Sequence, residues 1–194
     1  QKLVVDRDVV NELGPEALDA PPAWTLALIA RKKGKDIGDL VVFVLKRKRH
    51  EKLIEAIRRA GARVFLREGG DVAGALMAGY GGGVVDALMG TGGAAEGLVS
   101  ACALKVMGGQ ILSRIDPQSE EERKACQDAG MDINRILTAD DMVKGNSVYF
   151  SATGITDSVL LEGVHYHGDV VETHTLALRS ETGTRRMIKT EHRL

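Results

Sequence analysis

The sequence has few aromatic residues, only two cysteines and almost no net charge. Phenylalanine, tryptophan and tyrosine together make up 4% of the 194 residues. That share is too small for the stacking surface on which proteins bind single-stranded nucleic acids. The formal net charge of −1 gives no overall attraction to nucleic acid or to an anionic membrane. We therefore expect no nucleic-acid partner and no membrane partner.

Long apolar runs are also missing. No run approaches the roughly 20 residues of a membrane-spanning helix, and residues 1–7 lack the charged start and apolar stretch of a signal peptide. Cys102 and Cys126 have no CxxC partner, so we interpret them as buried, reduced thiols of a cytoplasmic protein. Residues 1–7 also read like a strand that is entered midway, which suggests a truncated chain.

Helical and strand patterns alternate along the chain as far as Gly145. A first helix is expected to begin at the pair Pro21-Pro22 and to end before Gly34. Strands are then predicted at 40–45, 62–66, 84–89 and 110–115, and helices at 50–60, 71–78, 95–107 and 119–129. Beyond Gly145 the pattern changes to strands, at 148–150, 170–179 and 184–192.

This order of elements predicts an α/β fold. Strands that alternate with helices pair in parallel through right-handed crossovers, and the last strands add antiparallel pairing. We expect a three-layer α/β/α sandwich with a mixed sheet, in which parallel βα units are followed by antiparallel C-terminal strands. Residues 1–37 are interpreted as an irregular opening segment with a first helix, and residues 38–194 as one α/β substrate-binding domain.

Unusual residues follow three of the predicted strands. Residues 46–50 are a run of lysine, arginine and histidine, residues 68–71 end in Asp71, and residues 90–97 form a glycine-rich loop with Glu96. Because the carboxyl ends of parallel strands meet at one edge of a sheet, these three loops should lie together where α/β proteins bind ligands. A cationic cluster, two carboxylates and a glycine loop are thus expected to converge.

Such a set of groups suits a phosphorylated sugar with a divalent cation. Arginine binds phosphate through two parallel hydrogen bonds, and helix N-termini offer backbone amides to an anion. The carboxylates of Asp71 and Glu96 would not bind a phosphate themselves, because like charges repel. Carboxylates beside a phosphate are explained if they accept hydrogen bonds from sugar hydroxyl groups or hold a hard metal ion.

Simpler interpretations exist for each part. The basic run has the composition of a solvated surface or a nucleic-acid tract, and Asp71 suits a helix N-cap. Gly90, Gly92 and Ala95 fit the GxGxxA dinucleotide fingerprint, although that motif normally follows the first strand and Glu96 would face the pyrophosphate. The pair Asp140-Asp141, which precedes Met142-Val143, is interpreted as a helix cap and not as a catalytic pair.

The order of these segments resembles the class II fructose-1,6-bisphosphatases, some of which also accept sedoheptulose 1,7-bisphosphate. The resemblance runs from about residue 38 to the last residue and is most specific at 90–101 and 151–163. It implies an enzyme of carbohydrate metabolism and gluconeogenesis that uses Mg²⁺ or Mn²⁺ to hydrolyse the C1 phosphate of fructose 1,6-bisphosphate and forms dimers or tetramers. Only the C-terminal portion of that family is matched, without the N-terminal domain that supplies most metal-binding carboxylates.

The resemblance also implies site residues. The substrate-contacting positions of the family fall on Arg47, Lys48, Arg49, Gly70, Asp71 and Gly93. Its metal-binding glutamate falls on Glu96, and no catalytic residue is assigned. Lys48 stands where the family has proline, and Gly69 stands where its substrate loop has a first aspartate.

Two further functions stay open at this point. A non-catalytic sugar-phosphate-binding domain is the first, because the metal-rich N-terminal domain is missing. A dinucleotide-binding oxidoreductase built on residues 90–97 is the second and is less favoured.

Overall fold

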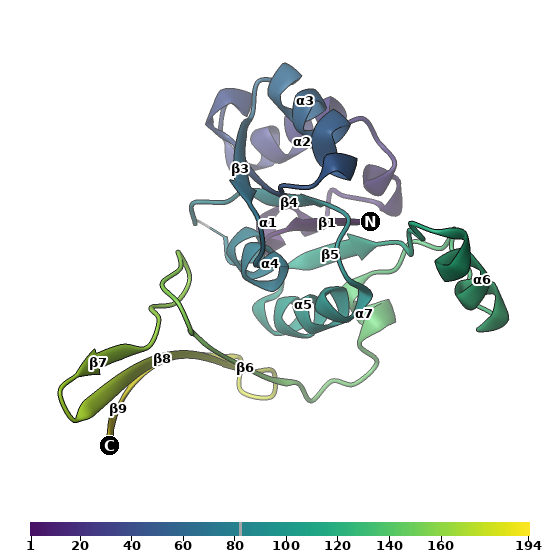
Figure 1. Cartoon of the computed structure of the whole chain (residues 1–194). Coiled ribbons are helices and arrows are strands. Elements are labelled where there is room, and N and C mark those ends of the chain that lie inside the picture. Colours follow the sequence, from purple (N-terminus) through teal and green to yellow (C-terminus); the bar gives the residue numbers. More distant parts are fainter. Residues whose placement is uncertain (82) are drawn as a thin grey trace. The chain divides into compact units, whose positions relative to one another are not determined.

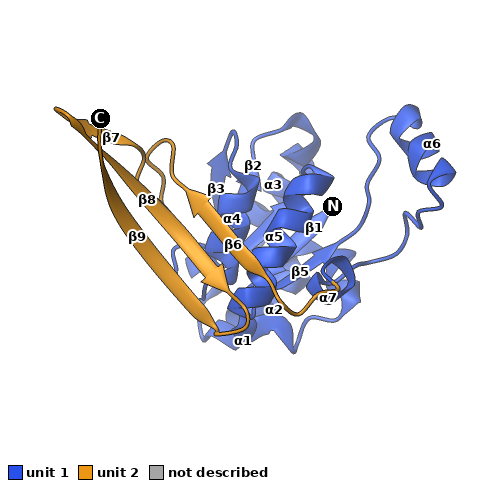
Figure 2. Cartoon of the chain, turned by 90° about the horizontal axis from the view of Figure 1, so that it is seen from below, with its two compact units in different colours: residues 1–143 blue, residues 144–194 orange. Residues whose placement is uncertain are grey.

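A computed structural model describes residues 1–81 and 83–194. It divides the chain into two units, residues 1–143 and residues 144–194 (Figure 2). The division expected from the sequence, at residue 38, differs from this one because Lys2–Val5 is a strand of the first unit. Within the described residues, none of the helices combines the length and the apolar character that crossing a bilayer requires.

The first unit alternates strands and helices (Figure 1). Its strands are β1 (Lys2–Val5), β2 (Val41–Leu45), β3 (Arg63–Arg67), β4 (Ala87–Gly90) and β5 (Gln110–Ser113). Its helices are α1 (Arg7–Val10), α2 (Pro22–Lys33), α3 (Glu51–Arg59), α4 (Asp71–Gly79), α5 (Ala94–Met107), α6 (Glu120–Asp128) and α7 (Ala139–Met142). Three short 3-10 turns are η1 (Pro15–Leu18), η2 (Ile37–Asp39) and η3 (Lys48–His50).

The five strands form one mixed sheet in the order β3-β2-β4-β1-β5. β2 is parallel to β3 and to β4, whereas β1 is antiparallel to β4 and to β5. The predicted α/β fold with a mixed sheet is therefore confirmed. An antiparallel strand in the middle of the sheet was not predicted.

Alternate residues of each strand face the two helical layers. Val42 and Val44 pack in the same apolar cluster as Ile29 of α2 and Ile57 of α3. The residue between them, Phe43, packs in a second cluster with helices α4 and α5. Strands with apolar residues on both faces are those of a sheet covered on both sides, and Figure 1 shows the sheet between these two pairs of helices.

The second unit is an antiparallel sheet. Its strands are β6 (Tyr149–Thr153), β7 (His165–His167), β8 (Val170–Arg179) and β9 (Thr184–Arg193). β6 and β7 pair with the two halves of β8, and β9 pairs with all of it. The antiparallel strands expected at the C-terminus are confirmed. They form a separate sheet and not an edge of the first one. In that sheet β8 is central, with strands of the same unit along both of its edges.

The start of β4 and the exposure of the two cysteines differ from what the sequence predicted. The strand expected at 84–89 starts only at Ala87. Cys102 and Cys126 are free thiols, as expected, but both are partly exposed and not buried.

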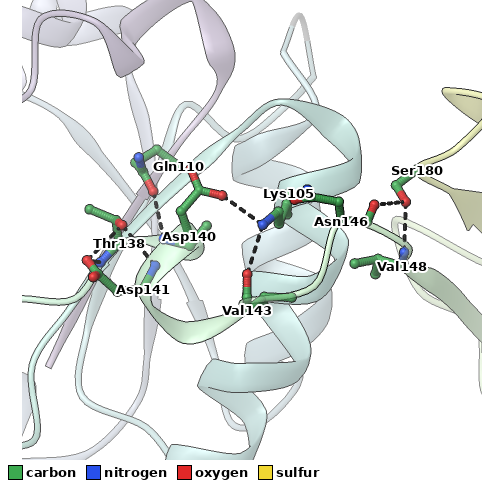
Figure 3. A network of polar contacts seen from close by, with 10 residues as sticks. Lys105, Gln110, Thr138, Asp140, Asp141, Val143, Asn146, Val148 and Ser180 are labelled. Atoms are coloured by element: carbon green, nitrogen blue, oxygen red, sulfur yellow. Dashed lines mark hydrogen bonds and ion pairs between the residues drawn. The ribbon is translucent and has the colours of Figure 1, made fainter.

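Polar contacts hold both ends of the short helix α7, which lies between β5 and β6 (Figure 3). The N-cap residue of α7 is Thr138, and Asp141 completes the reciprocal capping box from the third position of the helix. Asp141 therefore takes part in a helix cap, as expected, but the pair Asp140-Asp141 lies inside the helix and not before it. Lys105 of α5 donates to the carbonyl of Val143 at 2.8 Å and so holds the end of α7.

Candidate functional site

The three loops singled out in the sequence lie at one edge of the first sheet. β2, β3 and β4 run in the same direction, so residues 46–50, 68–71 and 90–97 all leave the sheet at their carboxyl ends. Because β1 runs the opposite way, it places Lys2 at this edge, opposite Gly90 on β4 and Ser113 on β5. In the strand order, residues 46–50 lie between the other two loops. The glycine-rich loop contacts both of them, through Arg49 and Asp71.

The basic residues of the first loop connect it to its neighbours. Arg49 donates from Nη2 to the carbonyl oxygen of Thr91 at 2.8 Å, and Arg47 donates from Nη2 to the carbonyl oxygen of Glu68 at 2.6 Å. Arg47, Lys48 and Arg49 are all exposed. A guanidinium group has five N–H donors in a planar fork, so both arginines keep donors for an anion after these bonds.

Asp71 is the first residue of α4, and Gly70 before it is the N-cap, with φ 85°. The interpretation of Asp71 as the N-cap is therefore wrong. Its carboxylate is 7% exposed and forms an ion pair with Lys2, which is 4% exposed. A Cβ on Gly92 would collide with Oδ2 of Asp71, so only glycine lets the loop approach this carboxylate.

Glu96 lies in the exposed first turn of α5, with Gly93 as the N-cap. A Cβ on Gly93 would collide with a carboxylate oxygen of Glu96, which shows that the side chain folds back over the start of the helix. A negative charge is favoured there by the helix dipole.

The described residues do not make up a metal site. Among them, no group of three or more His, Cys, Asp or Glu side chains is placed to hold an ion. Glu96 offers one carboxylate, whereas Mg²⁺ takes six oxygen ligands in near-octahedral order. The residues present therefore do not fit a complete metal centre, and no step of a reaction is assigned to a metal here.

A cavity of about 430 Å³ opens beside the site. Its lining includes Arg49, His50, Thr91 and Asp116, together with residues of β1, β4, η1, α2 and α3. Pockets for small ligands fall in this range of volumes.

Sequence reasoning found the convergence but missed several members. Arg49 donates to Thr91, and Asp71 lies against Gly92. Glu96 lies in the first turn of the helix that follows, so the predicted groups do meet at one loop. Lys2, His50, Thr91 and Asp116 were not assigned. A lysine opening an apolar strand was the available signal for Lys2, since the charge of a buried lysine requires a partner.

The geometry disfavours the dinucleotide interpretation. The carboxylates of Asp71 and Glu96 lie against Gly92 and Gly93, where a pyrophosphate would have to approach the backbone. Two negative charges at that point would repel it.

Comparison with known proteins decides the family. Residues 1–192 match the family model described as bacterial fructose-1,6-bisphosphatase, glpX-encoded. The chain belongs to this family. The match starts at residue 1, so the resemblance is not confined to residues after 38.

Similar proteins are class 2 members of the same fructose-1,6-bisphosphatase family. The D-fructose 1,6-bisphosphatase class 2/sedoheptulose 1,7-bisphosphatase of Synechococcus sp. (strain JA-3-3Ab) is 39% identical over 192 residues, which cover 92% of this chain and 55% of the relative. The fructose-1,6-bisphosphatase class 2 of Haemophilus influenzae is 35% identical over 207 residues, which cover 100% of this chain and 61% of the relative. The chain thus spans little more than half the length of these relatives.

Proposed function

We propose that this chain is the sugar-phosphate-binding part of a metal-dependent bisphosphatase. The substrate is fructose 1,6-bisphosphate, with sedoheptulose 1,7-bisphosphate as a second one, and water displaces the C1 phosphate to leave fructose 6-phosphate and inorganic phosphate. The observation that supports this most is the meeting of Arg49, Asp71 and Glu96 on the loop 90–96. The names of the relatives supply the substrate class.

Each residue has a proposed role in binding. Arg47, Lys48 and Arg49 bind the phosphate that is not cleaved, because ionised donors form the stronger hydrogen bonds to phosphate oxygens. Oδ2 of Asp71 accepts a hydrogen bond from Nζ of Lys2, and we propose that its other carboxylate oxygen accepts one from a sugar hydroxyl. Gly70 and Gly93 let the backbone approach the sugar phosphate closely.

Mg²⁺ or Mn²⁺ is proposed as the cofactor of the whole enzyme. When bound to the whole enzyme, such an ion would supply charge neutralisation at the phosphate and a more acidic water. Glu96 is proposed as one of its ligands. A cytoplasmic location and a homodimer or homotetramer stay predictions.

Calorimetric titration of the 194-residue chain tests the binding role. Without added metal, the chain should bind fructose 1,6-bisphosphate, and Arg49→Ala should weaken that binding by roughly 10- to 100-fold, because a charge-assisted contact is lost. Arg59→Ala is the matched control, since Arg59 is an exposed arginine at the far end of α3. Equal affinities of the wild type and Arg49→Ala would overturn the assignment.

Phosphate release separates catalysis from binding alone. If the chain binds the bisphosphate but releases no phosphate with Mn²⁺, it acts as a non-catalytic sugar-phosphate-binding domain on its own. A parallel titration with NADPH should show no binding, and tight binding would favour the oxidoreductase alternative.

A further inference from the structure

His50 differs from the four basic residues that precede it. Residues 46–49 are exposed, whereas the His50 side chain is only 3% exposed. It is the last residue of η3 and the N-cap residue of α3. Its ring lies between the end of β2 and the glycine-rich loop after β4, with Nδ1 2.7 Å from the carbonyl oxygen of Leu45 and Nε2 2.8 Å from the backbone nitrogen of Thr91.

These two partners specify one tautomer of the ring. A carbonyl oxygen can only accept, so Nδ1 of His50 must carry the hydrogen that binds Leu45. A backbone N–H can only donate, so Nε2 must be unprotonated to accept from Thr91. The buried ring is therefore neutral, with its proton on Nδ1.

Gly90 leaves room for this ring because it has no side chain. Its φ of 142° lies in the region that side chains rarely adopt, and an added Cβ would lie 3.0 Å from Cε1 of His50. The imidazole thus packs directly against the backbone at the point where β4 turns into the loop.

The backbone of Thr91 is held on both sides, its N–H and its carbonyl group, by two consecutive residues. His50 accepts its N–H, and Arg49 donates to its carbonyl oxygen at 2.8 Å. The Thr91 hydroxyl also donates to Oδ2 of Asp116 at 2.9 Å. Thr91 therefore joins the loops that follow β2, β4 and β5.

We propose that His50 is a positioning residue for the sugar-phosphate site. Backbone groups take both ring nitrogens. The ring thus fixes the Thr91 backbone, and through it the place of Arg49 and the course of residues 90–96. The expected effect of His50 on ligand binding rests on the proposed function, whereas its expected effect on the loop does not. A side chain with one donor and one acceptor should replace the imidazole in part, and an apolar one should not.

The first test needs no ligand. NMR of the ring nitrogens in the wild-type chain should show a neutral imidazole protonated at Nδ1. In His50→Leu, hydrogen exchange of the Thr91 amide should become about ten-fold faster, which is the effect of losing one hydrogen bond. In His50→Gln, whose amide can both donate and accept, exchange should recover in part. A ring protonated at Nε2, or unchanged exchange in His50→Leu, would overturn the proposal.

The second test separates positioning from general stability. Fructose 6-phosphate is titrated at a temperature where each variant is folded. A merely structural role would lower the unfolding temperature and leave the affinity of the folded chain unchanged. We expect about ten-fold weaker binding in His50→Leu, closer to wild-type binding in His50→Gln, and no change in the control His167→Leu, which removes an exposed histidine of the second unit.

The outcomes distinguish the two proposals. If the wild type fails to bind any sugar phosphate, the proposed function fails, while the exchange test still decides the role of His50. If the wild type binds and His50→Leu binds equally well, the positioning role is refuted and the proposed function stands. Should His50→Leu not fold, His50→Gln and the wild-type ring tautomer still test the inference.

Discussion

Lys2 and Asp71 form an ion pair that is almost entirely removed from water. Taking two charges out of water is costly, and removing one partner leaves the other buried without compensation. We expect Lys2→Met to lower the free energy of unfolding by about 3–5 kcal/mol. Urea denaturation measures this change. Lys124→Met, on the exposed helix α6, is the control and should change stability by less than about 0.5 kcal/mol.

A double variant sharpens this result. Lys2→Met combined with Asp71→Leu removes both charges, and it should recover part of the lost stability because an apolar pair needs no hydration. If the double variant is as unstable as the sum of the two single ones, the two side chains are not energetically coupled.

Lys2 and His50 also show what local sequence patterns can reveal. The basic run and the glycine loop were visible because their residue types are unusual for their places in the chain. The burial of Lys2 was not visible, because it follows from the insertion of β1 antiparallel between β4 and β5. Likewise, the His50 ring is buried by Gly90, which lies 40 positions further along the chain.

The start of strand β4 is anchored at the opposite edge of the sheet. Asp86 is 1% exposed. It accepts the N–H of Val41 at 2.9 Å and pairs with Lys35 at 2.7 Å and with Lys33 at 3.1 Å. This carboxylate therefore joins the starts of β2 and β4 to the end of α2.

Within this group of charges, the pKa of Asp86 is lowered and the pKa of Lys33 is raised. Burial by itself would raise the pKa of Asp86, but the bonds from Lys35, Val41 and Lys33 lower it below its usual value. Burial would lower the pKa of Lys33, but its bonds to Asp6 and Asp86 raise it. Asp86 therefore stabilises the fold above pH about 4, and this contribution is lost as the pH falls through its lowered pKa. The contribution of Lys33 is complete below pH about 10.4 and is lost as the pH rises through its raised pKa.

Asp86→Asn tests this linkage. The amide oxygen can still accept from Val41, so the variant removes mainly the charge. At pH 7 the free energy of unfolding should fall by about 3 kcal/mol, and the difference from wild type should shrink as the pH falls below about 4. Chemical denaturation across that range measures it. A difference of the same size at pH 3 and at pH 7 would show that charge is not the cause.

At the scale of the whole molecule, the class of fold was predictable and its division was not. Apolar runs such as 40–45 predict strands covered on both faces, and the order of elements then gives the three layers. The alternating strands after Gly145 predict antiparallel pairing, but not which sheet they join. In the structure they pair with one another around β8, and pairing between distant segments cannot be read from the sequence of a single strand.

The two units lead to a prediction about a shortened chain. Both apolar clusters of the α/β unit consist of residues from 1–143, and every candidate site residue from Lys2 to Asp116 lies there too. Residues 1–143 should therefore fold alone and bind fructose 6-phosphate within about three-fold of the full chain, a difference below about 0.7 kcal/mol. Calorimetry on both chains measures this, with Arg49→Ala in the shortened chain as the control. Folding with binding more than about ten-fold weaker would mean that residues 144–194 contribute to the site, because the shortened chain keeps all the side chains to which binding is assigned.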